Sequence, residues 1–272
     1  MDVFVISLGS SAQRRDHVAH QFDRANLRFS FFPAVLGDEG RRSFAAVDER
    51  RFLLGTGREP APGEIGCFAS HRRLWQACVD RNAPVLIMED DAHLEAGFPA
   101  ALGAARTLID RYAFLRLADE GPRTCAKTPI RSHGEFAVHY CSRYPYGALC
   151  YAVAPRVAAA FLAASRVFAS PVDLFIKQFW AHRQPLFALC PYSVSGSVHR
   201  HLSTIEYRGK SRPTWDLKLL RATLKASDAA QRALFNRRMI AAWTSAEGPG
   251  VPTPVDEPQS AHARLAPPHQ SA

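Results

Sequence analysis

The stretch VLIMEDDAHLE, residues 85–95, joins a short apolar run to three consecutive carboxylates. Its first four residues predict a strand buried on both faces of a sheet. Glu89, Asp90 and Asp91 then stand at the carboxyl end of that strand. Two carboxylates about 4 Å apart repel by roughly 4 kcal/mol at the effective dielectric of a protein surface, so the triplet needs a compensating divalent cation or arginine. A solvated turn or a helix cap is the alternative interpretation.

Strands and helices alternate on either side of this stretch. Apolar runs predict strands at residues 3–8, 29–35, 114–118 and 148–154. Helical periodicity and terminal signals predict helices at residues 64–80, 97–110 and 156–165. A repeated strand, helix, strand order indicates an α/β fold with a mostly parallel central sheet. In such a sheet ligands bind beyond the carboxyl ends of the strands, which is where the acidic triplet lies.

Charge and composition divide the chain of 272 residues into three parts. Residues 1–210 carry the alternating elements and form the predicted catalytic domain. Residues 211–247 read as basic amphipathic helices, and between 200 and 240 ten Lys and Arg face three acidic residues, a net +7 out of the chain's +9. Residues 248–272 are rich in Pro, Ser and Ala and predict a disordered tail.

Several protein classes fit this sequence poorly. The six cysteines form no C-x-x-C pair, which argues against a zinc site or disulfide scaffold and favours reduced thiols. The first residues, MDVFVISLG, lack a basic segment followed by a long apolar one, so no signal peptide is expected. The longest apolar stretch, at 147–164, is interrupted and too short to span a bilayer. A cytoplasmic protein is therefore expected.

Short motifs spread along the chain carry a resemblance to a known family. They are VFVISL with a following RR, GEIGCFASH at 63–71 with Trp75, VLIMEDD at 85–91, GALCYAVAP at 147–155, PVD at 171–173 and STI at 203–205. In this order they resemble glycosyltransferase family 25, the lipooligosaccharide β-galactosyltransferase group of bacterial outer-membrane glycan synthesis. The resemblance covers about residues 3–205.

The resemblance implies a GT-A-like catalytic domain that moves a hexose, usually from a UDP-sugar, to a growing glycan or glycolipid acceptor. It also implies a divalent metal, Mn²⁺ or Mg²⁺, held by Glu89 and Asp91 against the donor diphosphate, with Asp91 counted among the catalytic residues. The donor-binding residues that it implies are Ser7, Leu8, Glu64, Ser70, His71 and Asp90.

Other residues are candidates with an open alternative. Asp173 can act as the general base on the acceptor hydroxyl or can cap the helix that follows Pro171. Arg14 and Arg15 suit a diphosphate or stand on a solvated helix start.

Two histidines are equally open. His71 is expected on the side of its helix that faces the protein interior. There it can orient Glu64, contact the donor, or be a satisfied core residue. His201 can supply a third metal ligand or lie on a surface loop, as can His199.

Two other functions remain open at this stage. The pI of about 9.6 and the basic segment suit a nucleic-acid-binding protein, although no nucleic-acid-binding motif is present and no such partner is expected. A family member that binds glycan or donor without turnover is the other possibility. The basic helices can also contact anionic lipid at the inner face of the cytoplasmic membrane, or simply pack on the catalytic domain.

Overall fold

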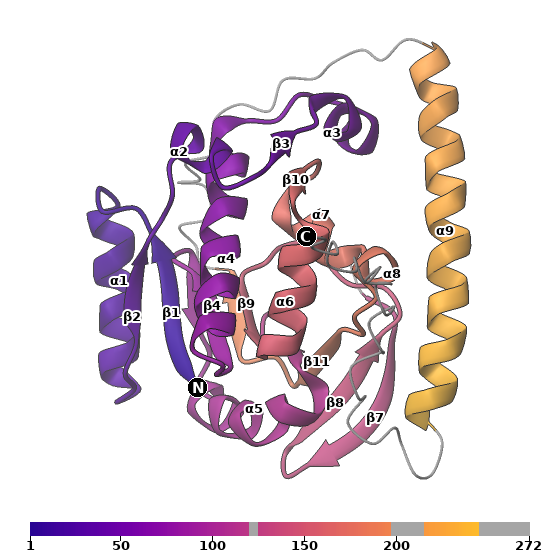
Figure 1. The fold of residues 1–272 in the computed structure, drawn as a ribbon. Coiled ribbons are helices and arrows are strands. Elements are labelled where there is room, and N and C mark those ends of the chain that lie inside the picture. The colour runs from indigo at the N-terminus through magenta and orange to yellow at the C-terminus, as the bar shows by residue number, and fades with distance from the viewer. Residues whose placement is uncertain (120–124, 197–214, 245–272) are drawn as a thin grey trace, which may run out of the picture.

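A computed structural model describes residues 1–119, 125–196 and 215–244 of the chain (Figure 1). The helices are α1 (Ala12–Arg24), α2 (Gly37–Arg41), α3 (Glu49–Thr56), α4 (Pro62–Asp80), α5 (Phe98–Tyr112), α6 (Pro155–Ala164), α7 (Val172–Lys177), α8 (Phe179–His182) and α9 (Trp215–Thr244). The strands are β1 (Asp2–Ser7), β2 (Ser30–Pro33), β3 (Ala46–Val47), β4 (Val85–Glu89), β5 (Ala92–Leu94), β6 (Phe114–Arg116), β7 (Lys127–His133), β8 (Phe136–Cys141), β9 (Cys150–Val153), β10 (Val167–Phe168), β11 (Phe187–Cys190) and β12 (Val194–Gly196). The predicted α/β fold is confirmed.

The central sheet has eight strands in the order β2-β1-β4-β9-β6-β11-β8-β7. Strands β9 and β8 run against all the others, so most of the sheet shares one direction. The expected strand, helix, strand unit around α5 is present, and β9 lies between its two parallel strands, β4 and β6. Ser7 and Glu89, the last residues of β1 and β4, therefore lie at the same edge of the sheet.

Aromatic packing fixes α4 over the sheet. The Trp75 ring is fully buried and contacts the rings of Phe68, Phe161 and Phe175, with centroid distances of 4.9 to 5.8 Å. Large buried rings dominate core energetics because each removes an extensive apolar surface from water. Helix α4 packs beside α6, as Figure 1 shows, and this contact fixes the direction in which the first turn of α4 points.

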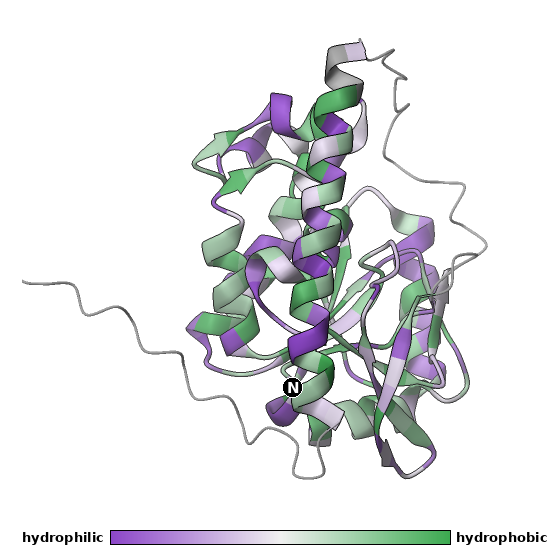
Figure 2. Cartoon of the chain, turned by 90° about the vertical axis from the view of Figure 1, so that its right-hand side faces the viewer, coloured by the Kyte–Doolittle hydropathy of each residue, from purple (hydrophilic) through white to green (hydrophobic). Residues whose placement is uncertain are grey.

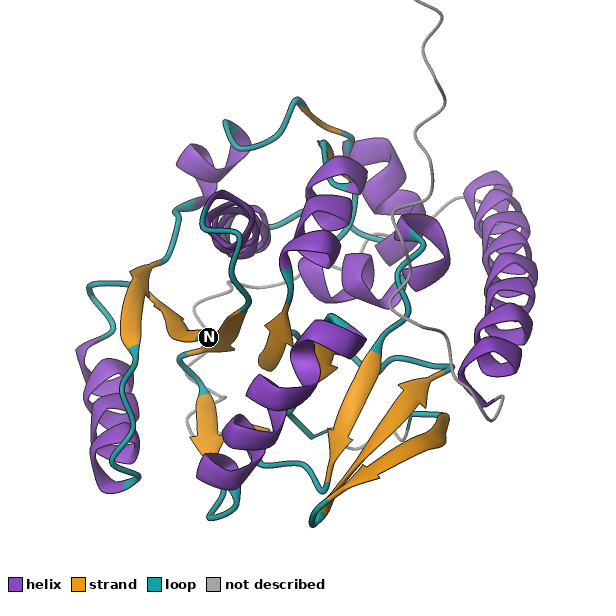
Figure 3. Cartoon of the chain, turned by 60° about the horizontal axis from the view of Figure 1, so that its bottom comes forward, coloured by secondary structure: helices purple, strands orange, loops and turns teal. Residues whose placement is uncertain are grey.

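Residues 119–146, which the sequence analysis leaves as a long loop, contain the hairpin of β7 and β8. It extends the edge of the sheet near α9 (Figure 3). Strand β7 is hard to recognise because it is polar, mostly accessible and interrupted by Pro129, where the register shifts. Edge strands tolerate proline and polar residues because one side of their backbone pairs with no other strand.

The C-terminal basic segment forms one continuous helix rather than several. Near the end of α9, Trp243 is 5% exposed and stacks on Tyr112, and Asn236 accepts a hydrogen bond of 2.7 Å from Tyr140 Oη. This part of the helix therefore packs on the α/β fold, which is the simpler of the two expectations for the basic segment. Figure 2 views α9 from its outer side, where hydrophilic and hydrophobic residues alternate.

No helix among the described residues combines the length and apolar character needed to cross a bilayer. All six cysteines lie in the described part of the chain, and none forms a disulfide. The predicted tail at 248–272 lies outside the described residues.

Gly66 allows α4 to approach the chain segment that follows β2. A Cβ atom at this position would collide with the carbonyl oxygen of Val35 and would lie 3.1 Å from the backbone of Leu36 and Gly37. Ser70, one turn further along α4, accepts a hydrogen bond of 2.8 Å from the Val35 amide. Because Gly66 has no side chain, this segment can lie directly against the helix. The hydrogen bond to the Ser70 hydroxyl then holds it there.

We therefore expect Gly66→Ala to lower the free energy of unfolding by about 1–3 kcal/mol, the usual cost of overpacking. Gly103→Ala is the matched control, because that helical glycine has open space around its Cβ position. Without a clash, replacing a helical glycine by alanine stabilises by roughly 0.5–1 kcal/mol. Urea unfolding of the two variants should give shifts of opposite sign. An equal stabilisation of both would contradict the close approach at Gly66.

Candidate active site

A cavity of about 360 Å³ lies at the carboxyl ends of β1 and β4. Its walls also include the start of α1, the first turn of α4 and residues 34–37 after β2. Of the residues that the sequence predicts for the site, those lining this cavity are Ser7, Leu8, Arg14, Ser70, Glu89, Asp90 and Asp91. The volume lies within the range of small-molecule sites.

Asp90 joins three elements at the base of the cavity. Its Oδ2 accepts a hydrogen bond of 2.6 Å from Ser7 Oγ, and its Oδ1 lies 2.9 Å from the Arg14 guanidinium. Burial raises the pKa of Asp90, and the Ser7 hydrogen bond and the Arg14 charge oppose that rise. The carboxylate therefore ties the ends of β1 and β4 to the start of α1. Ser7 and Arg14 lie in the predicted region, and both are held by this contact.

A chain of polar contacts runs from the core to Glu89. Trp75 Nε1 donates to Tyr151 Oη at 2.9 Å, Tyr151 Oη lies 2.8 Å from His71 Nδ1, and His71 Nε2 lies 3.3 Å from Glu89 Oε1. Burial raises the pKa of Tyr151, so the phenol keeps its proton. Since tryptophan only donates, the Tyr151 hydroxyl is free to donate to His71 Nδ1. His71 then carries its proton on Nε2 and donates it to Glu89.

This contact corrects one expectation for His71. The imidazole is fully buried and binds Glu89 and Tyr151 rather than Glu64. It acts as a satisfied core residue and, through Glu89, reaches the wall of the cavity. The sequence gives no sign of the Tyr151 contact, because the two residues lie 80 positions apart.

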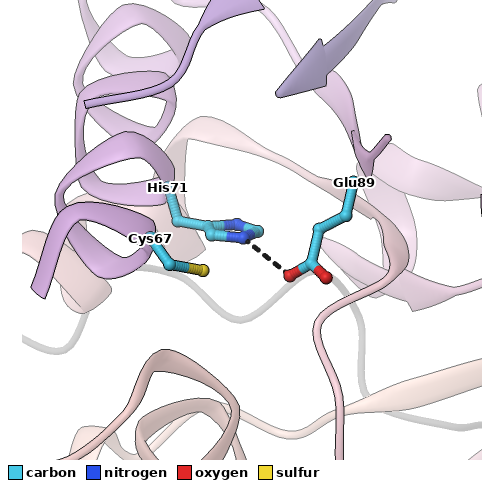
Figure 4. A group of neighbouring side chains, drawn as sticks. All are labelled: Cys67, His71 and Glu89. Atoms are coloured by element: carbon cyan, nitrogen blue, oxygen red, sulfur yellow. Dashed lines mark hydrogen bonds and ion pairs between the residues drawn. The ribbon is translucent and has the colours of Figure 1, made fainter. Parts of the chain in front are cut away.

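Cys67, His71 and Glu89 form a compact group whose possible ligand atoms all lie within 4.8 Å of one another (Figure 4). Burial raises the pKa of Cys67 well above its usual value, and the charges of Glu89, Asp173, Asp91 and Glu64 add to the rise. A protonated thiol is a weak metal ligand, and both His71 nitrogens are already in hydrogen bonds. The group therefore suits a hard cation poorly.

Glu89 and Asp91 fit a hard cation better. Glu89 Oε1 faces His71, whereas Oε2 accepts no hydrogen bond from the described residues. Asp91 is half-buried at the same wall of the cavity. Mg²⁺ and Mn²⁺ prefer carboxylate oxygens, which both of these side chains supply. Both side chains line the cavity and carry the type of ligand atom that such an ion prefers.

Glu64 has a structural role in this state. It forms a two-point ion pair with Arg58, in which Nη1 lies 2.6 Å from Oε2, and it accepts a hydrogen bond of 3.0 Å from the Ala61 amide at the start of α4. Its side chain is 3% exposed and does not line the cavity. The donor-binding role expected for Glu64 therefore receives no support from its position.

The positions of Arg15 and Ser70 also give little support to the donor-binding role expected for them. The Arg15 guanidinium lies 3.9 Å from the centre of the Phe31 ring and does not line the cavity. Ser70 reaches the wall, but its hydroxyl is engaged with the Val35 amide and with the carbonyl of Gly66, each at 2.8 Å. Ser70 thus positions residues 34–37, the part of the wall that the sequence analysis does not identify.

Asp173 lies in the first turn of α7, which Pro171 caps, so the interpretation of Asp173 as the N-cap is wrong. Its Oδ2 accepts a hydrogen bond of 3.3 Å from the Gly147 amide. It does not line the cavity, yet its charge acts on Cys67 and on Arg58, so it lies toward the same region. His199 and His201 lie outside the described residues.

Comparison with known proteins identifies the family of the chain. Residues 1–176 match the family model of glycosyltransferase family 25 (LPS biosynthesis protein). This match covers more than half of the chain and includes β1, α4, the acidic triplet and Asp173. The chain therefore belongs to glycosyltransferase family 25.

Individual relatives match shorter segments. The lipooligosaccharide biosynthesis protein lic2B of Haemophilus influenzae is 35% identical over 92 residues, 34% of this chain and 34% of the relative. The lacto-N-neotetraose biosynthesis glycosyltransferase LgtB of Neisseria meningitidis is 33% identical over 118 residues, 41% of this chain and 40% of the relative. A glycosyltransferase 25 family member of Drosophila melanogaster is 29% identical over 232 residues, 77% of this chain and 36% of the relative. The matched segments thus span little more than a third of these relatives.

The hydrogen-bond chain predicts the protonation of His71. In ¹⁵N NMR spectra at neutral pH, His71 should show a protonated Nε2 and an unprotonated Nδ1. Tyr151→Phe should weaken the preference of His71 for the tautomer with its proton on Nε2. It should also lower the free energy of unfolding by about 1–3 kcal/mol, because the buried polar groups of Trp75 and His71 lose their hydrogen-bond partner.

Tyr192→Phe is the matched control, since Tyr192 is only half-buried and its hydroxyl accepts a hydrogen bond of 3.4 Å from Lys127 Nζ. It should change stability by less than half as much. A protonated Nδ1 on His71 in the unmodified chain would show that the contacts run in the opposite direction.

Proposed function

We propose that this chain transfers a hexose, with galactose as the first candidate, from a UDP-sugar to a lipopolysaccharide, a lipooligosaccharide or another surface glycan. The observation that carries the proposal is the position of Glu89 and Asp91 on the wall of a ligand-sized cavity at the carboxyl ends of β1 and β4. The names of the bacterial relatives, which refer to lipooligosaccharide and lacto-N-neotetraose biosynthesis, support the acceptor class. The strand order around the cavity is compatible with a GT-A-type donor site.

The cavity offers two features that suit a nucleoside diphosphate. Ala61, Pro62 and Gly63 at the start of α4 line one wall, and the positive end of a helix dipole favours a phosphate. Arg14 also lines the cavity, where its guanidinium binds Asp90. Residues 34–37 complete the pocket, where backbone groups can contact the base or ribose.

Glu89 and Asp91 would hold Mn²⁺ or Mg²⁺ near the diphosphate. The ion would supply charge neutralisation for the departing nucleotide. His71 orients Glu89 through its Nε2 proton, so the direction of this carboxylate is set before any ligand binds. His201, which lies outside the described part of the chain, remains a candidate third ligand.

Asp173 is the proposed general base. A carboxylate must lie within hydrogen-bond reach of the acceptor hydroxyl to take its proton as the new glycosidic bond forms. The amides of Gly147 and Leu174 bind the two oxygens of Asp173 at 3.3 and 2.8 Å, and they hold the side chain in one orientation. The acceptor would enter between this residue and the cavity.

Metal and donor dependence test the proposal. Transfer or hydrolysis assayed over a panel of UDP-sugars should stop in EDTA and return with Mn²⁺ or Mg²⁺. Asp91→Asn and Glu89→Gln should lower kcat/KM at least 100-fold, a loss typical of removing a charge that acts in the transition state.

Glu135→Gln is the matched control, because Glu135 is exposed in the β7–β8 turn. Its activity should be unchanged. Full activity of Asp91→Asn, with metal dependence retained, would remove Asp91 from the metal site. Failure to bind UDP or to use any nucleotide sugar would favour a non-catalytic family member or a nucleic-acid-binding role.

We also propose that exposed residues of α9 contact anionic lipid at the inner face of the cytoplasmic membrane. Trp215, Leu219 and Leu224 are 78%, 60% and 44% exposed, and Lys225 and Arg237 are exposed on the same helix. Apolar side chains that insert at the lipid interface, together with cations that meet anionic head groups, are the features of an interfacial helix.

Cosedimentation with vesicles tests this contact. The chain should bind vesicles containing anionic phosphatidylglycerol and bind neutral phosphatidylcholine vesicles at least tenfold more weakly, because roughly 1 kcal/mol is contributed by each cation near an anionic surface. The double variant Leu219→Ser, Leu224→Ser should lose most of the binding. Val167→Ser, which changes an exposed apolar residue on β10, should keep it. Equal binding of both vesicle types would argue against the contact.

A further inference from the structure

A second cavity of about 330 Å³ lies away from the first, between the loop that precedes β9, the helices α7 and α8, and α9. Three cationic side chains line it, Arg143, Lys177 and Arg232, and its lining contains no carboxylate. Among the described residues none of the three forms an ion pair. The nearest acidic group on α9, Asp228, accepts a hydrogen bond of 3.4 Å from Trp180 Nε1.

Aromatic faces stand beside these cations. The Lys177 ammonium lies 3.7 Å from the centre of the Tyr146 ring, and the Arg232 guanidinium lies 5.6 Å from that of Trp180. Tyr146 is 46% exposed, so part of its surface is available to a ligand. Guanidinium groups bind phosphate and carboxylate oxygens in a two-point geometry, and aromatic faces pack on the apolar faces of sugar rings. The combination suits a sugar that carries a negative charge.

The loop in this cavity is fixed before a ligand arrives. Arg116 is 2% exposed, and its guanidinium donates to Tyr144 Oη at 3.2 Å, to the Gly147 carbonyl at 2.6 Å and to the Tyr146 carbonyl at 3.3 Å. A buried cation that binds several carbonyl groups at once holds the backbone in one arrangement. A preformed wall lowers the entropy lost on binding, as in most small-molecule sites.

The second cavity adjoins the proposed base. Asp173 and Lys177 lie four residues apart on α7, a separation of roughly 6 Å along the helix axis. Gly147, which follows Tyr146, donates its amide proton to Asp173. A ligand held by Lys177 and Tyr146 would therefore lie close to Asp173, whose charge acts on Cys67 at the wall of the first cavity.

We propose that the second cavity binds the acceptor through a phosphate or carboxylate group on one of its sugar units, with Arg143, Lys177 and Arg232 as the anion-binding residues and Tyr146 and Trp180 as stacking surfaces. The assignment to the acceptor rests on the proposed transferase function. The binding of a charged sugar does not. Phosphate and carboxylate share the recognition chemistry, and the probes below distinguish them.

Binding to the full chain can be measured by saturation-transfer NMR and calorimetry with three probes: glucose 6-phosphate, glucuronate and glucose. At least one charged sugar should bind at least tenfold more tightly than glucose, and the better of the two identifies the preferred anion. Lys177→Gln and Arg232→Gln should each weaken that binding at least fivefold. Arg238→Gln is the control, since it removes an exposed cation from α9 outside the cavity and should have no effect.

UDP binding, titrated in the same variants, reports on the first cavity and on correct folding. It should be unchanged by Lys177→Gln and Arg232→Gln. Equal binding of glucose and of both charged sugars, or unaltered binding in the variants, would overturn the proposal, and so would a loss of UDP affinity in the two variants. If UDP fails to bind the unmodified chain while the charged sugar still binds, the transferase function fails and the second site stands.

Discussion

The buried contact of Asp90 with Ser7 and Arg14 is the constraint on which the candidate site depends. A carboxylate that is 7% exposed is costly unless hydrogen bonds and an opposite charge satisfy it, and here both partners come from the first strand and helix of the chain. The contact therefore joins the ends of β1 and β4 to α1. The direction of the neighbouring residues, Glu89 and Asp91, follows from this fixed point.

The three adjacent carboxylates thus have unequal surroundings. Asp90 is neutralised by an arginine of the protein, whereas Glu89 receives a proton donor from His71 on one oxygen only. Repulsion within the triplet is relieved at its middle residue by the fold itself, and a cation at its outer two residues would relieve the remainder. The middle residue of this acidic motif is therefore structural, and the proposal of a metal site concerns only its two ends.

Much of the fold could be predicted from the sequence because apolar runs and helical periodicity are local signals. Strands β1, β4 and β9 and helices α4 and α5 lie close to their predicted ranges. The hairpin at 127–141 escapes prediction because β7 is a polar edge strand, and residues alone do not show that α9 is continuous. In each case the missing information is the packing of an element on a distant neighbour.

The site is predictable to a smaller extent for the same reason. The acidic triplet and the GEIGC segment indicate where the first cavity lies, but the partners of each side chain come from far along the chain. Glu64 binds Arg58, and His71 binds Tyr151, a contact between residues with no shared motif. Residues 34–37 line the first cavity because they pack against Gly66 and Ser70 of α4. The sequence does not show that α4 needs a glycine and a serine at these positions, because it does not show that the two segments touch.

Net charge is a poor guide to this molecule because its cations have different surroundings. The charges of Arg14 and Arg58 are balanced by Asp90 and Glu64, and Arg116 is satisfied by backbone carbonyl groups and Tyr144. Arg143, Lys177 and Arg232 remain as a group without ion pairs among the described residues.

The charged residues that line the first cavity beside β4 are acidic, and those that line the second, to which α7 contributes Lys177, are all basic. Such a division of charge would orient an anionic acceptor by attracting its charged group to one cavity, while the carboxylates beside the other would repel that group. The hydroxyl at the far end of the acceptor would then be the one directed toward Asp173. In this arrangement the position of each cation, rather than the sum of +9, determines what the protein can bind.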